Sequence, residues 1–385
     1  MHGTVSILQN FAARRRRSPA INSYLLPRRL TVSGWSIPFS TIDEASVSGG
    51  SITANNENAG GIVGAITDTD TDKNTTSTIS NSTAKVVTIT AKTNAGGIAG
   101  LANGNPNAGS DKSGEVTIDS CTINSNQVKG STQVGGVVGK AENAIITNLI
   151  VDGEVNLTAV DNEGVTKVYF GGIAGWSNST ISFTNTSFTI NVEKDANVEE
   201  AANYVGGLVG YSKGTISGLN GIVITVIAEE SNYVGGVFGH NANAVNSLTN
   251  LENGAITITP TVTGSNYVGG IAGMNEGTLN AMRVNAGMIR GVDKVAGIVG
   301  KNDVVDKNIG TISDCQLSVV VAGDFVITAT DGLGAGFAGE NAGTITKPDV
   351  SGGQVIIRHE DEGYTATDIT NDLDLDAVFD VSEYS

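Results

Sequence analysis

The chain contains few of the residues that usually carry chemistry. Its 385 residues include 3 histidines, 2 cysteines, 2 tryptophans and 6 prolines. His2, His240 and His359 stand far apart, and the sequence has no His-Glu-x-x-His helix, Gly-x-Ser-x-Gly elbow, phosphate loop or Cys-x-x-Cys pair. We therefore assign no catalytic, cofactor-binding or metal-ligating residue, and we expect a protein that is not an enzyme and needs no cofactor.

Charged residues are also scarce, and most of them are negative. They make up 16% of the chain, with a formal net charge of −17, against about 25% in an average protein. The only basic run, Arg14 to Arg17, lies within residues 1–30, which we interpret as a solvated N-terminal segment. Because an acidic body repels nucleic acid, no nucleic-acid partner is expected.

Long apolar runs are absent as well. No stretch of about 18 apolar residues occurs, so no transmembrane segment is expected. Residues 1–30 also lack the order of a secretory signal, which has a positive start, an apolar stretch and a small-residue cleavage site. We expect either that the true start lies upstream or that export uses another route.

Glycine, in contrast, is abundant and regularly placed, with 51 residues. A five-residue motif recurs, in which Gly or Ala is followed by Gly, an aliphatic or aromatic residue, Ala, Val or Phe, and Gly. Its nine copies begin 27 to 39 residues apart, at Gly60, Gly96, Gly135, Gly171, Gly206, Gly235, Gly269, Ala296 and Ala335. One such unit cannot bury its own apolar face, whereas stacked units form a continuous core. The repeat therefore predicts one elongated domain.

The unit from Asn203 to Val226 indicates what each repeat contains. We interpret residues 203–212 as one strand, residues 215–219 as a second and residues 222–226 as a third. A β-propeller blade needs four strands in about 40–45 residues, whereas a solenoid accommodates variable repeat lengths as loops. We predict an all-β, parallel β-solenoid, β-helix-like and right-handed, built from about nine Gly-rich repeats.

The predicted solenoid covers residues 44–357. Residues 1–43 form a basic N-terminal segment and possible N-cap, in which Trp35, Pro38 and Phe39 can cover the first coil. Residues 358–385 form an acidic C-terminal tail or C-cap. Its apolar residues, from Ile369 to Phe379, can cover the last coil, and a solvated acidic segment is the alternative.

Stacking of the repeats is expected to place equivalent residues in rows along the axis. Two such rows are Tyr169, Tyr204, Tyr233 and Tyr267, and Asn241, Asn275, Asn302 and Asn341. Stacked Asn side chains can hydrogen-bond from layer to layer. The tyrosines could form an aromatic platform for sugars, but their position in the repeat already explains them.

The two cysteines are predicted to be core residues. Cys121 and Cys315 sit in matching local sequences, and Leu219 and Met282 take the same position in other repeats. The two thiols are five to six repeats apart. At about 4.8 Å per layer, they are too distant for a disulfide.

Carboxylates give only weak signals of function. Five of them, dispersed over different repeats and expected on the solvated surface, are Asp119, Asp152, Glu193, Asp293 and Asp314. Two alternating runs resemble half of a calcium loop without its Gly and distal Glu, namely Asp68, Asp70 and Asp72, and Asp372, Asp374 and Asp376. We assign no metal to either run.

The motif at residues 233–241 and 267–275, followed by Gly277-Thr278-Leu279, resembles the GLUG motif repeats of bacterial surface proteins. The resemblance spans residues 44–350. It implies a secreted or cell-surface bacterial protein, often adhesin-like, and it brings no catalytic residue with it. Such repeats also accompany the catalytic domain of immunoglobulin A metalloproteases, but the zinc helix of those enzymes is missing from this sequence.

We therefore predict a non-catalytic, extracellular or cell-surface repeat protein that serves as an adhesion or binding stalk toward glycans or host proteins. One alternative is a carbohydrate-active β-helix enzyme, a lyase or glycosidase with a groove of carboxylates. Another is a passive structural or ice-binding array with a flat Thr-x-Thr face, of which residues 257–259 and 261–263 give a hint.

Overall fold

The computed structural model describes most of the repeat region. The described residues are 36–37, 41–55, 57–68, 75–106, 114–124, 126–160, 165–183, 187–194, 202–217, 222–243, 248–249, 256–285, 287–305, 308–318, 325–332, 334–346, 349–351, 355–359 and 367–369. Arg14 to Arg17, Trp35, Pro38, Phe39, Leu219 and Asp372 to Asp376 lie outside them, as do the side chains of Thr257 and His359.

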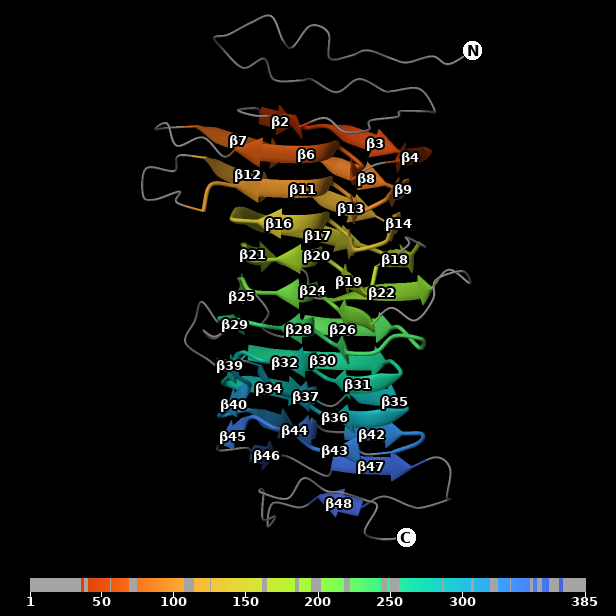
Figure 1. Ribbon diagram of the computed structural model, residues 1–385, viewed down its shortest axis with the longest axis vertical. Coiled ribbons are helices and arrows are strands. Elements are labelled where there is room, and N and C mark those ends of the chain that lie inside the picture. The colour runs from red at the N-terminus through yellow and green to blue at the C-terminus, as the bar shows by residue number, and fades with distance from the viewer. Residues whose placement is uncertain are drawn as a thin grey trace, which may run out of the picture.

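The chain is an all-β parallel solenoid, as the sequence predicts. Figure 1 shows short strands stacked in layers along the long axis, with the colour running from red to blue in chain order. The described residues contain no helix, and therefore none that is long and apolar enough to cross a bilayer. Their strand pairs are parallel except for two, β38 with β39 and β47 with β48. The right-handed sense stays a prediction.

Two sheets meet at the glycine motif. We call them the inbound sheet, whose strands end at the motif's first residue, and the outbound sheet, whose strands begin after the turn. The inbound sheet contains β5 (Asn58–Gly60), β10 (Asn94–Gly96), β15 (Gln133–Gly135), β19 (Lys167–Gly171), β23 (Ala202–Gly206), β27 (Val234–Gly235), β31 (Asn266–Gly269), β36 (Asp293–Ala296) and β43 (Gly334–Ala335). The outbound sheet contains β1 (Ser36–Ile37), β6 (Val63–Asp68), β11 (Ala99–Gly104), β16 (Val138–Glu142), β20 (Ala174–Ser177), β24 (Val209–Ser212), β28 (Phe238–Asn241), β32 (Ala272–Asn275), β37 (Val299–Asn302) and β44 (Ala338–Asn341).

The rest of each coil forms a side sheet and a back sheet. The side sheet contains β2 (Thr41–Asp43), β3 (Ser46–Ser48), β7 (Thr76–Ser80), β8 (Thr83–Lys85), β12 (Glu115–Asp119), β13 (Thr122–Asn124), β17 (Ala144–Asp152), β21 (Thr180–Phe183), β25 (Thr215–Ser217) and β29 (Leu248–Thr249). A separate three-stranded sheet contains β33 (Thr278–Asn280), β40 (Thr311–Ser313) and β45 (Thr344–Thr346), and a small hairpin contains β38 (Val304–Val305) and β39 (Asn308–Ile309).

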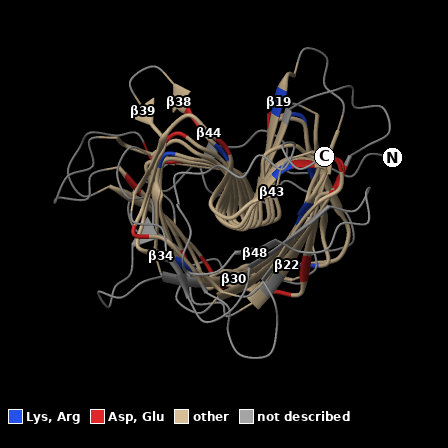
Figure 2. Ribbon diagram, turned by 90° about the horizontal axis from the view of Figure 1, so that it is seen from below, with Lys and Arg blue, Asp and Glu red and all other residues tan. Residues whose placement is uncertain are grey.

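The back sheet is the largest. It contains β4 (Ser51–Ala54), β9 (Thr88–Ala91), β14 (Gln127–Gly130), β18 (Glu154–Ala159), β22 (Ser187–Lys194), β26 (Ile222–Ile227), β30 (Ile256–Thr263), β34 (Met282–Asn285), β35 (Met288–Gly291), β41 (Gln316–Ser318), β42 (Phe325–Ala329), β46 (Asp349–Ser351), β47 (Val355–His359) and β48 (Thr367–Ile369). Figure 2, seen along the axis, places β22 and β30 across the coil from β19 and β44.

The prediction of one strand over residues 203–212 is wrong. The chain turns sharply at the motif, so that β23 ends at Gly206 and β24 begins at Val209, in two different sheets. Figure 2 shows these turns folding inward toward the middle of the coil. The aliphatic residue at the turn is buried in the core, as Leu208 is. A regular strand would instead have placed Leu208 and Val209 on opposite faces.

The motif's glycines are required by close approaches of backbone. A Cβ on Gly206 would lie 2.0 Å from the Val209 carbonyl oxygen across the turn, and one on Gly207 would lie 2.0 Å from the Gly236 oxygen of the next layer. A Cβ on Gly273 would lie 2.1 Å from the carbonyl carbon of Tyr233 in the facing inbound segment. The turn also pairs from layer to layer, since Ile98 N donates to Val137 O at 2.8 Å. At the motif, each coil therefore packs backbone against backbone, and it is hydrogen-bonded to the neighbouring coils.

The core is one continuous cluster of small and β-branched side chains along the axis. Cys121 and Cys315 belong to it, as predicted, and both are free thiols. Burial raises the pKa of each thiol to about 11. Met282 is also buried, at 1% exposure, which agrees with its predicted equivalence to Cys315. These residues act as core side chains.

The first described strands already belong to the stack. β1 pairs with β6, and β2 pairs with β7, both in parallel. At the other end β48 pairs antiparallel with β47. The boundaries after residues 43 and 357 stay predictions.

Candidate functional site: an aromatic seam

Aromatic side chains gather where the inbound and outbound sheets face each other. The strand sequence explains the inbound side, because Val168 and Phe170 point into the core and leave Tyr169 between them on the opposite face. The position next to the last motif glycine supplies the outbound side. We call the following residues the aromatic seam: Tyr169, Tyr204, Tyr233, Tyr267, Trp176, Tyr211 and His240.

The four inbound tyrosines stack in a row, as the sequence predicts. Ring centroids lie 5.3 Å apart for Tyr169 and Tyr204, 4.7 Å for Tyr204 and Tyr233, and 4.8 Å for Tyr233 and Tyr267. The last pair is inclined by only 3°. These spacings match the distance between layers of a parallel sheet. The ring faces are therefore turned toward each other along the axis.

The aromatic residues of the outbound sheet contact this row. The sequence had not predicted these contacts. The Tyr211 ring lies 5.3 Å from Tyr169 and 6.0 Å from Trp176, and the His240 ring lies 5.5 Å from Tyr204 and 4.8 Å from Tyr211. Trp176, Tyr211 and His240 pair in register from β20 to β28. Their common place after the last glycine of the motif was a signal that could have revealed them.

Lysines cover both ends of the seam. Lys140 Nζ lies 5.2 Å from the Trp176 ring centroid, and at the other end Lys294 and Lys301 lie 5.0 and 5.8 Å from Tyr267. Acidic residues pair with these lysines. The Nζ–carboxylate distances are 2.9 Å for Lys140 and Glu142, 2.7 Å for Lys294 and Asp293, 3.0 Å for Lys301 and Asp303, and 3.4 Å for Lys301 and Glu340. Two further lysines lie over the middle of the seam, Lys167 and Lys213, each with Nζ 5.8 Å from the ring centroid, of Tyr204 and Tyr211 respectively. The lysines at the two ends are thus paired with carboxylates.

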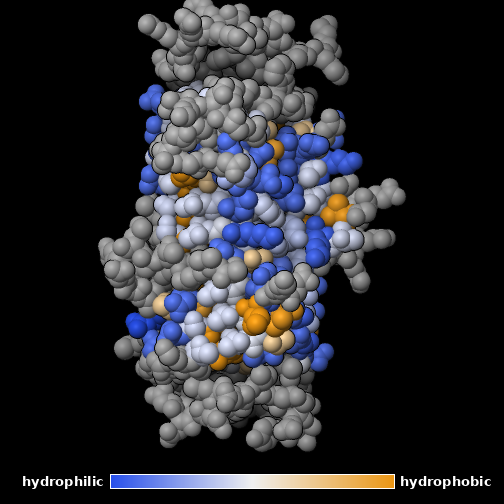
Figure 3. Space-filling model, turned by 60° about the vertical axis from the view of Figure 1, so that its left-hand side comes forward, coloured by the Kyte–Doolittle hydropathy of each residue, from blue (hydrophilic) through white to orange (hydrophobic). Residues whose placement is uncertain are grey.

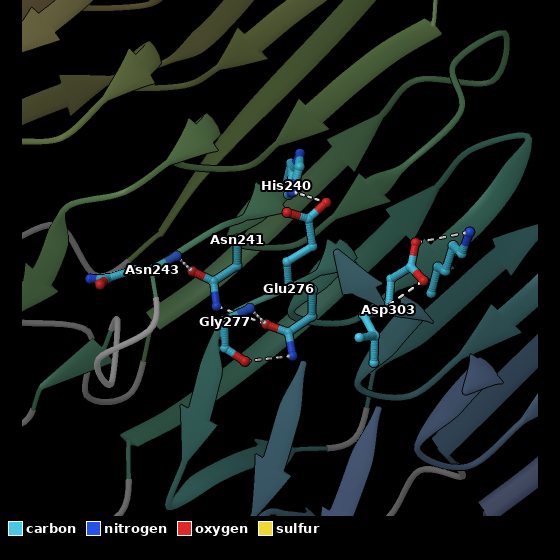
Figure 4. A network of polar contacts seen from close by, with 9 residues as sticks. His240, Asn241, Asn243, Glu276, Gly277 and Asp303 are labelled. Carbon is cyan, nitrogen blue, oxygen red and sulfur yellow. Dashed lines mark hydrogen bonds and ion pairs between the residues drawn. The ribbon is translucent and has the colours of Figure 1, made fainter. Parts of the chain in front are cut away.

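His240 and Glu276 form the most enclosed polar pair of the seam, with 7% and 9% of their surface exposed. Figure 4 shows the two side chains facing each other, and His240 Nε2 lies 3.1 Å from Glu276 Oε1. The two atoms are within ion-pair distance, and Nε2 makes no hydrogen bond with any other group of the described structure.

The predicted Asn row lies beside the seam, one position further along the outbound strands. Asn241 Nδ2 donates to Asn275 Oδ1, Asn275 Nδ2 to Asn302 Oδ1, and Asn302 Nδ2 to Asn341 Oδ1, each at 2.8 Å. Asn275 also exchanges hydrogen bonds with the backbone of Gly277 (Figure 4). Asn241, Asn275 and Asn302 are fully buried. This row fixes the chain where it leaves the outbound sheet.

A family match covers the third copy of the motif. The model of the GLUG motif matches residues 130–156, which run from the end of β14 through the Gly135 turn into β18. This match and the β-solenoid fit a GLUG repeat protein. No curated protein and no solved structure gives a significant match to it.

The carboxylates that were singled out in the sequence do not form one cluster. Asp119 accepts hydrogen bonds from Thr147 and Asn148, and Asp152 accepts one from Asn124. Asp293 pairs with Lys294 at the seam. Glu193 and Asp314 are exposed, and Asp68 is buried near Ser77. No three His, Cys, Asp or Glu side chains gather at a common point in the described part of the chain.

Burial opposes the ionisation of Tyr169, Tyr204, Tyr211 and Tyr233. Burial raises the pKa of Tyr169 to about 12, with smaller contributions from Tyr211 and Glu276. Burial also raises the pKa of Tyr204, Tyr211 and Tyr233. Because the unfolded chain releases these protons near pH 10, the stability that they contribute is complete below pH 10 and is lost as the pH rises through the folded pKa.

We expect the tyrosinate absorbance of the folded protein to lag behind that of the urea-unfolded protein between pH 10 and about 12. The free energy of unfolding should fall over the same range. A Tyr204→Phe variant should reduce the lag, since it removes one protected phenol. Superimposable titration curves for folded and unfolded protein would contradict the buried seam.

Proposed function

We propose that this protein is a non-catalytic binding stalk, secreted or carried on a bacterial cell surface, and that it binds glycans or extracellular proteins. Support comes first from the way the layers are joined. The sheets, and also the motif turns between them, are hydrogen-bonded from layer to layer. Such a body resists bending and presents the same side-chain positions at regular intervals, which suits contact with an extended ligand.

The surface of the back sheet supports the same proposal. Its outward positions are largely Ser, Thr, Asn and Gln, as in the row Ser51, Thr88, Gln127, Asn156 and Asn191. A few exposed apolar side chains stand among them, namely Val223 at 43%, Ile227 at 38% and Met288 at 48% exposure. Figure 3 shows another face of the molecule, on which hydrophilic and weakly polar residues also predominate and apolar residues form small patches.

One observation favours an enzyme as a second candidate. His240 and Glu276 are enclosed beside aromatic rings, and His and Glu are side chains that serve as general acids and bases in catalytic sites. A glycosidase commonly needs two carboxylates about 5–10 Å apart. The resemblance to GLUG repeats of surface proteins favours the stalk over the enzyme.

An immobilised-ligand screen with product analysis separates these candidates. Purified protein is applied to a glycan array and to extracellular-matrix proteins, and the same glycans are incubated with it and analysed for shortened products. We expect retention and no products. Release of oligosaccharides would overturn the stalk in favour of the enzyme, and absence of retention on every ligand would overturn it in favour of a passive array.

A further inference from the structure

We propose that the aromatic seam is the binding site of this stalk, and that its ligand is a neutral, extended β-linked glycan lying along the solenoid axis. This inference rests on the proposed binding function and adds to it the site and the ligand class. The back sheet and the hairpin of β38 and β39 expose apolar side chains, but nothing about them selects an occupant. The seam has features that do.

The first feature is a row of tyrosine hydroxyl groups that make no hydrogen bond with the protein. In the described structure the hydroxyls of Tyr169, Tyr204, Tyr233 and Tyr267 make no hydrogen bond with the protein, and none is among the enclosed unpaired polar atoms. These hydroxyls therefore reach solvent, one in each layer. A ligand with a hydroxyl group at every layer could pair with each of them.

The enclosed nitrogen of His240 is not one of these groups. Nε2 lies 3.1 Å from Glu276 Oε1 and is closed to solvent, and its ring contacts Tyr204 and Tyr211. The pair therefore belongs to the packed interior of the seam, and a ligand would bond with the tyrosine hydroxyls.

The spacing of the row fits a polymer better than a small molecule. Amide side chains continue the tyrosine row at its N-terminal side, since Asn58 pairs with Asn94, Asn94 with Gln133 and Gln133 with Tyr169 in register. The layers are about 4.8 Å apart, and an extended β-1,4-linked pyranose chain advances by nearly that distance per sugar. One sugar per layer would therefore meet one polar side chain per layer.

The net charge of the molecule favours a neutral ligand. Lys140, Lys294 and Lys301 each pair with a carboxylate, whereas Lys167 and Lys213 lie over the Tyr204 and Tyr211 rings. The whole chain carries −17 and repels polyanions. The aromatic faces are already stacked on one another. Recognition is therefore by ring edges and hydroxyls, with hydrogen bonds supplying most of the selectivity.

The test compares two variants for binding to labelled β-1,4-linked oligosaccharides of glucose, N-acetylglucosamine and mannose, with oligogalacturonate as the acidic comparison. The triple variant Tyr169→Phe/Tyr233→Phe/Tyr267→Phe removes three hydroxyls and keeps the ring stack. The matched control, Thr225→Val/Thr261→Val, removes two hydroxyls from the outer face of the back sheet. Circular dichroism establishes that both variants fold.

We expect the wild type to bind at least one neutral series, with an affinity that rises at each step from two to six sugars. The triple Phe variant should bind the hexamer at least about tenfold more weakly, because each lost hydrogen bond contributes about 1 kcal/mol, and the Thr variant should stay within about twofold of the wild type.

The outcomes that overturn the inference are distinct from those that overturn the stalk. Equal hexamer binding by the triple Phe variant would show that the seam is not the binding site. A preference for oligogalacturonate would show that the ligand is not neutral. Either result would leave a glycan-binding stalk. Binding to matrix proteins alone would overturn the glycan and leave the stalk. Binding to no ligand, or cleavage of the hexamers, would overturn both.

Discussion

Substitution of Gly273 by alanine should destabilise the protein by about 3 kcal/mol, the upper range for overpacking. The added methyl group would lie 2.1 Å from the carbonyl carbon and 2.4 Å from the carbonyl oxygen of Tyr233. Both are backbone atoms, so no side-chain rotation relieves the contact. The inbound and outbound sheets would have to separate at this point. Their separation would also disturb the stacking of the Tyr233 ring on the Tyr267 ring. Urea unfolding followed by circular dichroism measures the loss.

Gly49→Ala is the matched control for this substitution. A Cβ on Gly49 meets nothing within 4 Å, and only its φ of +70° opposes a side chain, which costs about 1–2 kcal/mol. An unfolding midpoint of Gly273→Ala equal to that of the wild type would show that the two sheets do not pack in backbone contact at the motif.

Substitution of Asn275 by aspartate should destabilise the protein by about 4 kcal/mol at neutral pH, since it places an unpaired charge in the interior. The new carboxylate would face Asn302 Oδ1 and Gly277 O, which now accept hydrogen bonds from Asn275 Nδ2 at 2.8 and 3.1 Å. Two acceptors would meet at each of these contacts. The expected loss is larger than for removal of the amide alone, because the charge is also desolvated.

The pH dependence of Asn275→Asp identifies the cause. Burial should raise the pKa of the new carboxyl in the folded state above its unfolded value of about 4. The destabilisation should therefore be small below about pH 4 and grow as the pH rises. Asn266→Asp is the control, because the Asn266 side chain, which donates to Asn232 at 3.1 Å, is only half-buried. A loss of stability for Asn275→Asp that does not change with pH would contradict burial of the charge.

Position in the repeat was enough to predict both rows of stacked side chains. The tyrosine and asparagine rows needed only the motif spacing, because parallel layers bring equivalent residues together. The turn at Gly207 and Leu208 was not predictable by strand alternation, since the glycines permit a backbone conformation that alternation does not describe. The contacts of Trp176, Tyr211 and His240 with the tyrosines depend on that turn.

The rows of this solenoid change their chemistry along the axis. The buried outbound position is Ile66, Ala102 and Ala141 in the first copies, Ser177 and Ser212 in the middle, and Asn241 and its partners afterwards. The inbound row passes from amides to tyrosines to Lys294. Nine similar motifs offer many ways to pair out of order during folding. Slippage by one copy would leave an Asn or a Tyr without its partner at each of these transitions. The side chains at these positions thus distinguish one coil from the next, and only one order of assembly pairs all of them.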